Sequence, residues 1–439
     1  MDQTGRWGER VPRSEALTVE LGTGTMVPVP TYPRKSFARC MITPPFQSAQ
    51  TLCETHPFLK ALQSDAGLAA LKVMEEAKGN VLQFRLQGAF PSGFPAFLAT
   101  LVLARQKYAD RFPLAHNMVF TTRAAEQATG ERIAYYKTRF AHGAKRILVA
   151  CSGLGGELMH LVRAFPHAEI VAVDADPDVL AYSAWNTLLV ADHPNLQFVC
   201  ARLEDVLPHL GTFDHCFFDP DRRTGGKRRL ALADYTPDPN VLIPELLNIA
   251  EAVHTKVSPM LRDFGVHLPH AITWIEEGWT LKECVLHHGT GTYPSVVHIE
   301  GENILEDPVL SPASPTAQEY LVELSPALLR AGQVDVVASA LSARRLHPKS
   351  SLLLTKSPVA HPMLRYYAVE KQVPFAPKQL KKQLRGLSFV VKKRFFPLEP
   401  REILRLLSVK EGGDTVLFCT TVAPATRVAF FCKRGIVGA

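Results

Sequence analysis

The 439-residue chain has an ordinary soluble composition, 46% hydrophobic and 21% charged, and its length allows two or three domains. No apolar run is long enough to span a bilayer, and the first residues contain no hydrophobic signal-peptide core. Its eight cysteines form no Cys-x-x-Cys pair, which excludes a zinc ribbon, so we expect no metal site and a reducing cytoplasmic location. The net charge of +7 mildly favours a polyanionic partner.

The first third of the chain is expected to be an arm followed by helices. Residues 1–50 mix Gly, Pro, Thr and charged residues without periodicity, which is typical of a disordered arm. Apolar residues at three-to-four spacing then predict a helical region over residues 51–140.

The last of these helices should run from Arg123 to Phe140. The favoured interpretation is a packing or lid helix in front of a sheet. In the alternative, Gln127, Thr129 and Lys137 line a cofactor pocket, because a helix just before the first strand is in the right place to do so.

Between residues 141 and 306, short β-type runs alternate with helical spacers, which predicts an α/β domain with a parallel, doubly wound sheet. The last two runs are close in sequence, with Gly289 and Gly291 between them, and suit an antiparallel hairpin at the sheet edge. The seven expected strands are Arg146–Ala150, Ile170–Val173, Leu196–Cys200, His215–Phe218, Ala252–Thr255, Trp279–His287 and Ser295–Ile299.

The region 307–439 has a different texture and reads as a small α+β region after a Pro- and Gly-containing linker. Its expected strands include Tyr366–Val369, Ser388–Val391, Thr415–Thr420 and Arg427–Cys432, and its expected helices include Pro377–Arg385 and Glu399–Leu407.

A glycine-rich turn follows the first strand, as Cys151-Ser-Gly153-Leu-Gly155-Gly. Such a turn lets the backbone approach a ligand closely. Asp174 lies 21 residues after Gly153 at the end of the second strand, where a carboxylate can accept both ribose hydroxyls. A dinucleotide fingerprint requires Gly or Ala where the chain has Leu158, so S-adenosylmethionine (SAM) is favoured over NAD.

The adenine contact is less well defined. SAM-binding domains usually carry an acid just after strand three, but this chain has Arg202 there. Asp205 or the Leu203 backbone is the candidate to contact the adenine amino group. We therefore assign Cys151, Gly153, Gly155, Asp174, Asp205 and Thr129 as candidate cofactor-binding residues.

The fourth strand ends in Asp219-Pro-Asp-Arg-Arg223, which is similar to the Asp/Asn-Pro-Pro-aromatic motif of enzymes that methylate exocyclic amines. The stacking aromatic is replaced, and Arg222 could stack or bind a phosphate instead. Asp219, Pro220 and Arg222 are the candidate catalytic residues, and Arg223 and Lys227 are candidate substrate contacts. A solvated loop with ion pairs is the alternative for the basic run.

The acceptor is expected to be a nitrogen or a ribose oxygen, with a base nitrogen favoured. A carbon-5 pyrimidine acceptor would need a nucleophilic cysteine at the active edge, and strand five ends in Lys256-Val-Ser-Pro without one. In the C-terminal region, Lys392, Lys393 and Arg394 precede two phenylalanines, which is consistent with RNA contact and equally with a solvated surface.

Four stretches together resemble a bacterial family of class I RNA methyltransferases with a C-terminal THUMP-like domain. They are Glu126–Thr129 with Tyr136–Phe140, the Gly153 turn, Asp219–Arg223 and Val391–Phe395. The resemblance spans roughly residues 60–435. It implies a Rossmann-like, seven-stranded class I sheet over 141–306, a THUMP-like domain at about 360–436, SAM binding and an RNA substrate.

The sequence thus predicts a SAM-dependent methyltransferase acting on structured RNA, either tRNA or rRNA. Two alternatives stay open: a non-catalytic RNA-binding or assembly factor on a degenerate methyltransferase scaffold, and a methyltransferase for a protein or a small molecule.

Overall fold

The computed structural model describes residues 18–21, 25–28, 46–79, 90–224, 227–228, 231–265, 269–311 and 313–435. The chain divides into two compact units, Met1–Thr43 and Pro44–Ala439. In the first unit, β1 (Thr18–Leu21) pairs antiparallel with β2 (Thr25–Pro28). The rest of the predicted arm, up to residue 45, lies outside the described residues.

The second unit begins with short helices that start at polar caps. The Ser48 hydroxyl accepts a hydrogen bond from the backbone N–H of Thr51 at the start of the first helix. The Ser64 hydroxyl accepts one from the N–H of Gly67 at the start of the third helix. His56 and Asp178 join these helices to the sheet domain at 3.1 Å. The helices are α1 (Ala49–Thr55), α2 (Pro57–Gln63), α3 (Asp65–Glu76) and α4 (Phe94–Lys107).

The helix predicted from Arg123 to Phe140 is in fact three pieces. They are α5 (Thr122–Gln127), α6 (Glu131–Lys137) and the 3₁₀ turn η2 (Thr138–Ala141). The break occurs because Ala128 and Gly130 both adopt extended ψ angles, 144° and 152°. Periodicity continues through the break, which is why the sequence pattern concealed it.

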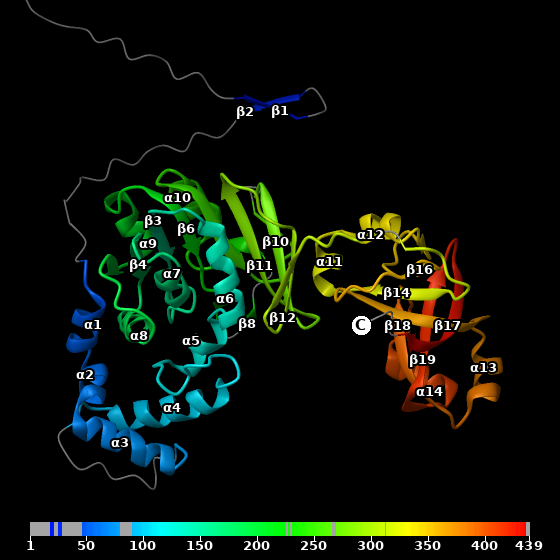
Figure 1. The fold of residues 1–439 in the computed structure, drawn as a ribbon, viewed down its shortest axis with the longest axis horizontal. Coiled ribbons are helices and arrows are strands. Elements are labelled where there is room, and N and C mark those ends of the chain that lie inside the picture. The colour runs from blue at the N-terminus through cyan, green and yellow to red at the C-terminus, as the bar shows by residue number, and fades with distance from the viewer. Residues whose placement is uncertain are drawn as a thin grey trace, which may run out of the picture. The chain divides into compact units, whose positions relative to one another are not determined.

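The central sheet has nine strands, two more than predicted, in the order β13-β12-β10-β11-β9-β6-β3-β4-β5 (Figure 1). Its parallel half contains β3 to β6 and β9, each within about two residues of the predicted limits. The strands are β3 (Arg146–Ala150), β4 (Glu169–Asp174), β5 (Leu196–Cys200), β6 (Phe213–Phe218), β9 (Ala250–Val257), β10 (Ala271–Glu277), β11 (Thr280–Gly289), β12 (Val296–Glu300) and β13 (Asn303–Glu306).

The predicted edge hairpin is wrong. The antiparallel hairpin is β10–β11, whereas β12 pairs parallel with β10. Strand β10 was not predicted, and its two terminal acidic residues, Glu276 and Glu277, do not fit the pattern of a buried apolar strand. Glu276 is nevertheless fully buried, since its carboxylate accepts the Ala327 N–H at 2.9 Å and lies 2.8 Å from His298 Nδ1.

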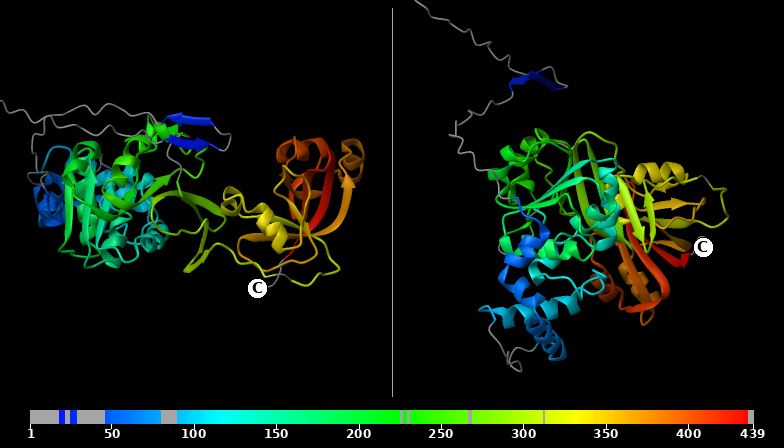
Figure 2. Two further views of the ribbon diagram at one scale, coloured as in Figure 1. Left: turned by 90° about the horizontal axis from the view of Figure 1, so that it is seen from above. Right: turned by 60° about the vertical axis from the view of Figure 1, so that its left-hand side comes forward.

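Helices cover both faces of this sheet, as Figures 1 and 2 show. Alternating strand residues divide between two cores: Ile147 and Val149 face one cluster, and Leu148 and Ala150 face the other. This alternation is expected of strands buried on both faces. The remaining elements are α7 (Leu158–Ala164), α8 (Pro177–Leu188), α9 (Leu203–Val206), η3 (Leu207–His209), η4 (Leu232–Asp234) and α10 (Pro239–Leu247).

The C-terminal part contains a second sheet of seven strands, ordered β15-β16-β14-β17-β20-β19-β18. It is antiparallel except for the β18–β19 pair. Its elements are β14 (Tyr320–Leu324), α11 (Pro326–Arg330), α12 (Val334–Ala340), β15 (Arg344–Arg345), β16 (Leu353–Thr355), β17 (Leu364–Pro374), α13 (Pro377–Leu384), β18 (Ser388–Arg394), α14 (Pro400–Leu407), β19 (Lys410–Val422) and β20 (Thr426–Gly435).

Candidate active site

A cavity of about 610 Å³ lies at the carboxyl ends of β3, β4 and β6. Parallel strands bring their following loops together at this edge, which is where open α/β sheets bind ligands. Seven of the nine sequence-predicted catalytic and cofactor residues line this cavity, and Gly155 and Asp205 do not. The seven are Thr129, Cys151, Gly153, Asp174, Asp219, Pro220 and Arg222.

The turn after β3 packs closely against α8 and the α5–α6 connection. Gly155 has a positive φ of 79°, and a Cβ there would lie 2.5 Å from Ser183 Oγ. At Gly156 a Cβ would lie 3.1 Å from the Thr129 carbonyl oxygen. Gly155 thus packs inward rather than facing the cavity, and Gly156 allows the α5–α6 connection to approach the turn.

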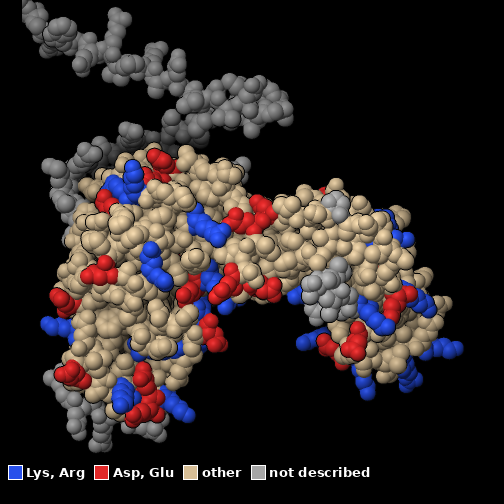
Figure 3. All heavy atoms as spheres, viewed as in Figure 1, with Lys and Arg blue, Asp and Glu red and all other residues tan. Residues whose placement is uncertain are grey.

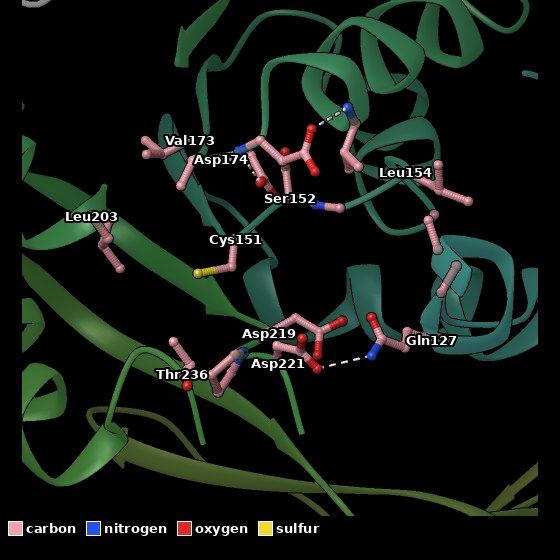
Figure 4. Close-up of a pocket in the computed structure, with 18 of the residues that line it drawn as sticks. Gln127, Cys151, Ser152, Leu154, Val173, Asp174, Leu203, Asp219, Asp221 and Thr236 are labelled. Carbon is pink, nitrogen blue, oxygen red and sulfur yellow. Dashed lines mark hydrogen bonds between the residues drawn. The ribbon is translucent and has the colours of Figure 1, made fainter. Parts of the chain in front are cut away.

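Cys151 also has a positive φ, 58°, and its side chain lies between Asp174 and Asp219 in Figure 4. Burial raises the pKa of its thiol well above the ordinary value, and the nearby carboxylates raise it further. The thiol is therefore protonated at neutral pH and is a poor nucleophile.

Asp174 ends β4 and is held by the backbone of the turn. Its Oδ2 accepts the Gly153 N–H at 2.9 Å, and its Oδ1 accepts the Asp176 N–H at 3.0 Å. Burial raises the pKa of Asp174, although these amide contacts oppose the effect. Each carboxylate oxygen keeps a further lone pair for a hydroxyl donor.

Asp219 directly follows β6 and lies across the cavity from Asp174 (Figure 4). Its backbone N–H donates to Ala150 O at 3.1 Å, and its Oδ2 accepts from Lys256 Nζ at 2.7 Å. Burial raises the pKa of Asp219, and the positive charge of Lys256 works against this rise.

Asp221 fastens α5 to the loop after β6. Its carboxylate accepts from Gln127 Nε2 at 2.8 Å and lies 2.9 Å from Arg123 Nη2 (Figure 4). Its backbone forms a two-way bridge to Thr236, with N–O distances of 2.8 and 3.0 Å. Asp221, which stands where the amine-methylation motif has its second proline, therefore closes one side of the cavity.

A buried charged network lies under the α5–α6 connection. Lys137, 2% exposed, contacts the carboxylates of Glu157 and Glu283, the latter at 2.6 Å, and Thr129 Oγ1 donates to Glu157 at 2.8 Å. Burial alone would lower the pKa of Lys137, but the two carboxylates raise it overall. Burial acts to raise the pKa of Glu157, yet Lys137 and Lys256 bring it down to about 2.

Sequence reasoning placed Gln127, Thr129 and Lys137 together as possible pocket residues. Gln127 and Thr129 line the cavity, but Lys137 lies beneath it and supports Thr129 through Glu157. The roles of Glu157 and Glu283 were missed, because nothing in their local sequence marks them as partners of Lys137.

The charge of the lining favours a cationic ligand. Seven carboxylates and three guanidinium groups face the cavity. They are Glu157, Asp174, Asp176, Asp178, Glu204, Asp219 and Asp221, with Arg123, Arg202 and Arg222. Its volume also lies within the usual range for small-molecule sites.

The structure favours one of the two candidates for the expected adenine contact. Arg202, Leu203 and Glu204 line the cavity, whereas Asp205 is in the first turn of α9 and is not a lining residue. The Leu203 backbone is therefore better placed than Asp205 for this contact.

Two further predicted substrate residues, Arg223 and Lys227, lie in β7 (Arg223–Thr224) and β8 (Lys227–Arg228), which pair antiparallel beside the loop after β6. The structure describes their backbone only.

The three predicted basic contacts of the C-terminal region make internal ion pairs. Glu323, almost fully buried, binds Lys392 and Arg394, each at 2.6 Å, while Lys393 lies 2.5 Å from Glu399. Arg394 and Lys392 lower the pKa of Glu323 against the effect of burial. Lys392 and Arg394 therefore stabilise the fold around Glu323.

A cluster of exposed basic residues lies instead on α13 and just after it. Leu380 and Leu384 bury one face of this helix, and the other face is charged. Among the described residues, none of these four cations forms an ion pair: Lys378, Lys381, Lys382 and Arg385. Basic side chains project where Figure 1 places α13 and α14 (Figure 3).

Comparison with known proteins identifies one domain of the chain and a protein of similar fold. Residues 364–434 match the THUMP domain-like family model, which confirms the predicted THUMP-like domain. The fold of the chain is similar to that of a "putative methyltransferase from Porphyromonas gingivalis W83", with a TM-score of 0.68 and 21% identity over 85% of this chain and 99% of that one. No curated protein matches.

Other matches are more distant. One is precorrin-6y C5,15-methyltransferase of Geobacter metallireducens GS-15, with 12% identity, a TM-score of 0.25 and coverage of 30% of this chain and 64% of that one. Another is a SAM-dependent methyltransferase of Agrobacterium tumefaciens, with 17% identity, a TM-score of 0.22 and coverage of 28% and 42%.

Within the described residues, no helix is both long and apolar enough to cross a membrane. In the same part of the chain, no group of three His, Cys, Asp or Glu side chains is arranged to hold a metal ion.

Proposed function

We propose that the chain is a SAM-dependent methyltransferase that modifies structured RNA, with a base nitrogen as the acceptor. The observation that carries this proposal is the meeting of Gly153, Asp174 and Asp219 around one cavity with an excess of carboxylates. SAM bears a positively charged sulfonium, so this lining suits it.

In this proposal the two sides of the cavity have different roles. Asp174 accepts the ribose hydroxyls of the cofactor, Gly153 contacts its methionine end, and the Leu203 backbone faces its adenine. The bound cofactor supplies an activated methyl group, so the protein contributes mainly proximity and orientation.

Asp219 is the proposed acceptor contact. Its Oδ2 is occupied by Lys256, and no hydrogen bond to its Oδ1 is seen among the described residues, so Oδ1 is available for an amine hydrogen. Pro220 and Arg222 also line this side, where the guanidinium can pair with a phosphate of the substrate. The side chains of Arg223 and Lys227 are proposed to contact the same substrate.

The RNA substrate rests on the family resemblance, the THUMP-like domain and the exposed cations of α13. Lys392, Lys393 and Arg394 contribute through the shape of that domain rather than as free cations. The seven cysteines of the described residues are all free, which agrees with the proposed cytoplasmic location.

The proposal is tested by label transfer from SAM to total RNA of a deletion strain. Wild-type protein should label RNA, and Asp219→Ala should lower the rate at least 100-fold. Absence of transfer for both proteins would favour the non-catalytic RNA-binding alternative. Label that survives ribonuclease treatment would indicate a protein or small-molecule substrate.

A further inference from the structure

A second groove, of about 1290 Å³, lies on the other side of the α5–α6 connection. It shares Gln127, Thr129 and Arg222 with the candidate active site. Lys256 lines this second groove but is not among the residues that line the first cavity. Its ammonium therefore reaches Asp219 from behind the active site.

Lys256 is 3% exposed and makes two polar contacts. Its Nζ donates to Asp219 Oδ2 at 2.7 Å and to the Gln127 carbonyl oxygen at 2.9 Å. An ammonium engaged in this way is not directed at an acceptor in the first cavity. The geometry therefore disfavours the role of a general base that touches substrate.

The Gln127 carbonyl is at the C-terminal end of α5, where helix carbonyls lack partners within the helix. Lys256 satisfies this carbonyl, and Arg111 binds the neighbouring carbonyls of Ala125 and Ala128. The Lys256 ammonium thus joins the Asp219 carboxylate to the end of α5, the helix that closes one side of the cavity.

We propose that Lys256 is a positioning residue for Asp219. It fixes Oδ2, leaves Oδ1 toward the cavity, and holds the carboxylate in its ionised, accepting form. The proposal rests on the proposed function, in which Asp219 accepts hydrogen bonds from an amine. An ionised carboxylate only accepts hydrogen bonds, whereas protonation turns one of its oxygens into a donor.

Other groups also act on Asp219. Lys256 is the strongest of the opposing charges, since burial and Glu157 raise the pKa of Asp219 while Lys256 and Arg222 lower it. Removal of the ammonium should therefore move the titration of Asp219 to higher pH. The charged or titratable groups that face Asp219 are Lys256 from β9, Glu157 before α7, Arg222 after β6, Cys151 after β3 and Tyr235 after η4.

The test is a carbon-13 NMR titration of aspartate carboxyl groups, with the Asp219 signal assigned by Asp219→Asn. Lys256→Met should raise the Asp219 midpoint by at least one pH unit, and Lys256→Arg should stay within half a unit of wild type. If Lys256→Met does not fold, Lys256→Gln carries the same test, because it keeps a donor and loses the charge. An unmoved midpoint would overturn the proposal.

Activity supplies a second readout. Lys256→Met should lower label transfer at pH 7 by 10- to 100-fold, and the deficit should narrow as the pH is raised, because a higher pH favours the ionised Asp219 without the ammonium. Lys282→Met, at an exposed lysine of the same second groove, should leave the rate unchanged. A deficit equal at all pH values would contradict the positioning role. If wild-type protein transfers no label, the proposed function fails, but the NMR titration still decides the role of Lys256.

Discussion

Replacement of Lys137 by Met should destabilise the fold strongly, because it leaves two buried carboxylates without their shared cation. Both acids contact Lys137 Nζ, and their side chains are 9% and 5% exposed. Removing one partner of a buried ion pair typically costs about 3–5 kcal/mol. Lys137 is also the charge that does most to lower the pKa of Glu157 against the effect of burial, so its loss acts directly on that carboxylate.

The assay is thermal unfolding at several pH values. For a unit of this size, about 3–5 kcal/mol corresponds to a fall in Tm of roughly 3–6 °C at pH 8. In wild type, the lowered pKa of Glu157 contributes stability above pH 4.5 that is lost as the pH falls toward 2. In the variant, burial without the cation raises that pKa, so the variant loses stability as the pH rises.

The difference in Tm between the two proteins should therefore shrink as the pH is lowered from 8 to 4.5. A variant that melts with wild type at pH 8 would refute the reasoning. So would a difference that is the same at both pH values, since that would indicate lost packing rather than uncompensated charge.

Three other changes have definite expected outcomes. Asp221→Ala should release α5 from the loop after β6 and speed amide hydrogen exchange in α5 at least tenfold, as measured by mass spectrometry. Burial lowers the pKa values of five histidines, one of them, His160, to about 4, so the free energy of unfolding should fall as the pH drops below 6.5. His254→Phe should reduce that slope in urea titrations at pH 6.5 and 5. Charge reversal of Lys381 and Lys382 to Glu should weaken RNA binding at least tenfold and flatten its dependence on salt in filter-binding assays.

The first two of these predictions would each be contradicted by one result. Unchanged exchange in α5 would mean that Asp221 does not hold the helix. An identical pH slope for His254→Phe would show that the buried histidines do not control acid stability. The matched control for α13 is reversal of Lys60 and Lys72, exposed lysines of the N-terminal helices, which should leave RNA binding unaltered.

The sequence was sufficient to predict those site residues that lie at the ends of predicted strands. The Gly153 turn, Asp174 and Asp219 each follow a strand directly, so strand prediction alone placed them at one edge of the sheet. The C-terminal elements were predictable for the same reason, since their strands and helices are continuous in sequence.

What could not be predicted depends on partners that are distant in sequence. Glu283 is 146 residues from Lys137, and no local pattern pairs them. Lys392 was interpreted as an RNA contact because its neighbours are basic, yet its partner Glu323 lies 69 residues earlier. The missed strand β10 contains the buried Glu276, whose hydrogen-bonding partners His298 and Ala327 meet it only in the folded chain.

Isothermal titration calorimetry with SAM tests the central claim most directly. The account predicts saturable, one-to-one binding to the purified protein, and at least a tenfold loss of affinity in Asp174→Ala with the thermal transition retained. Absence of binding heat with both SAM and its demethylated product, or equal affinity in wild type and Asp174→Ala, would contradict it.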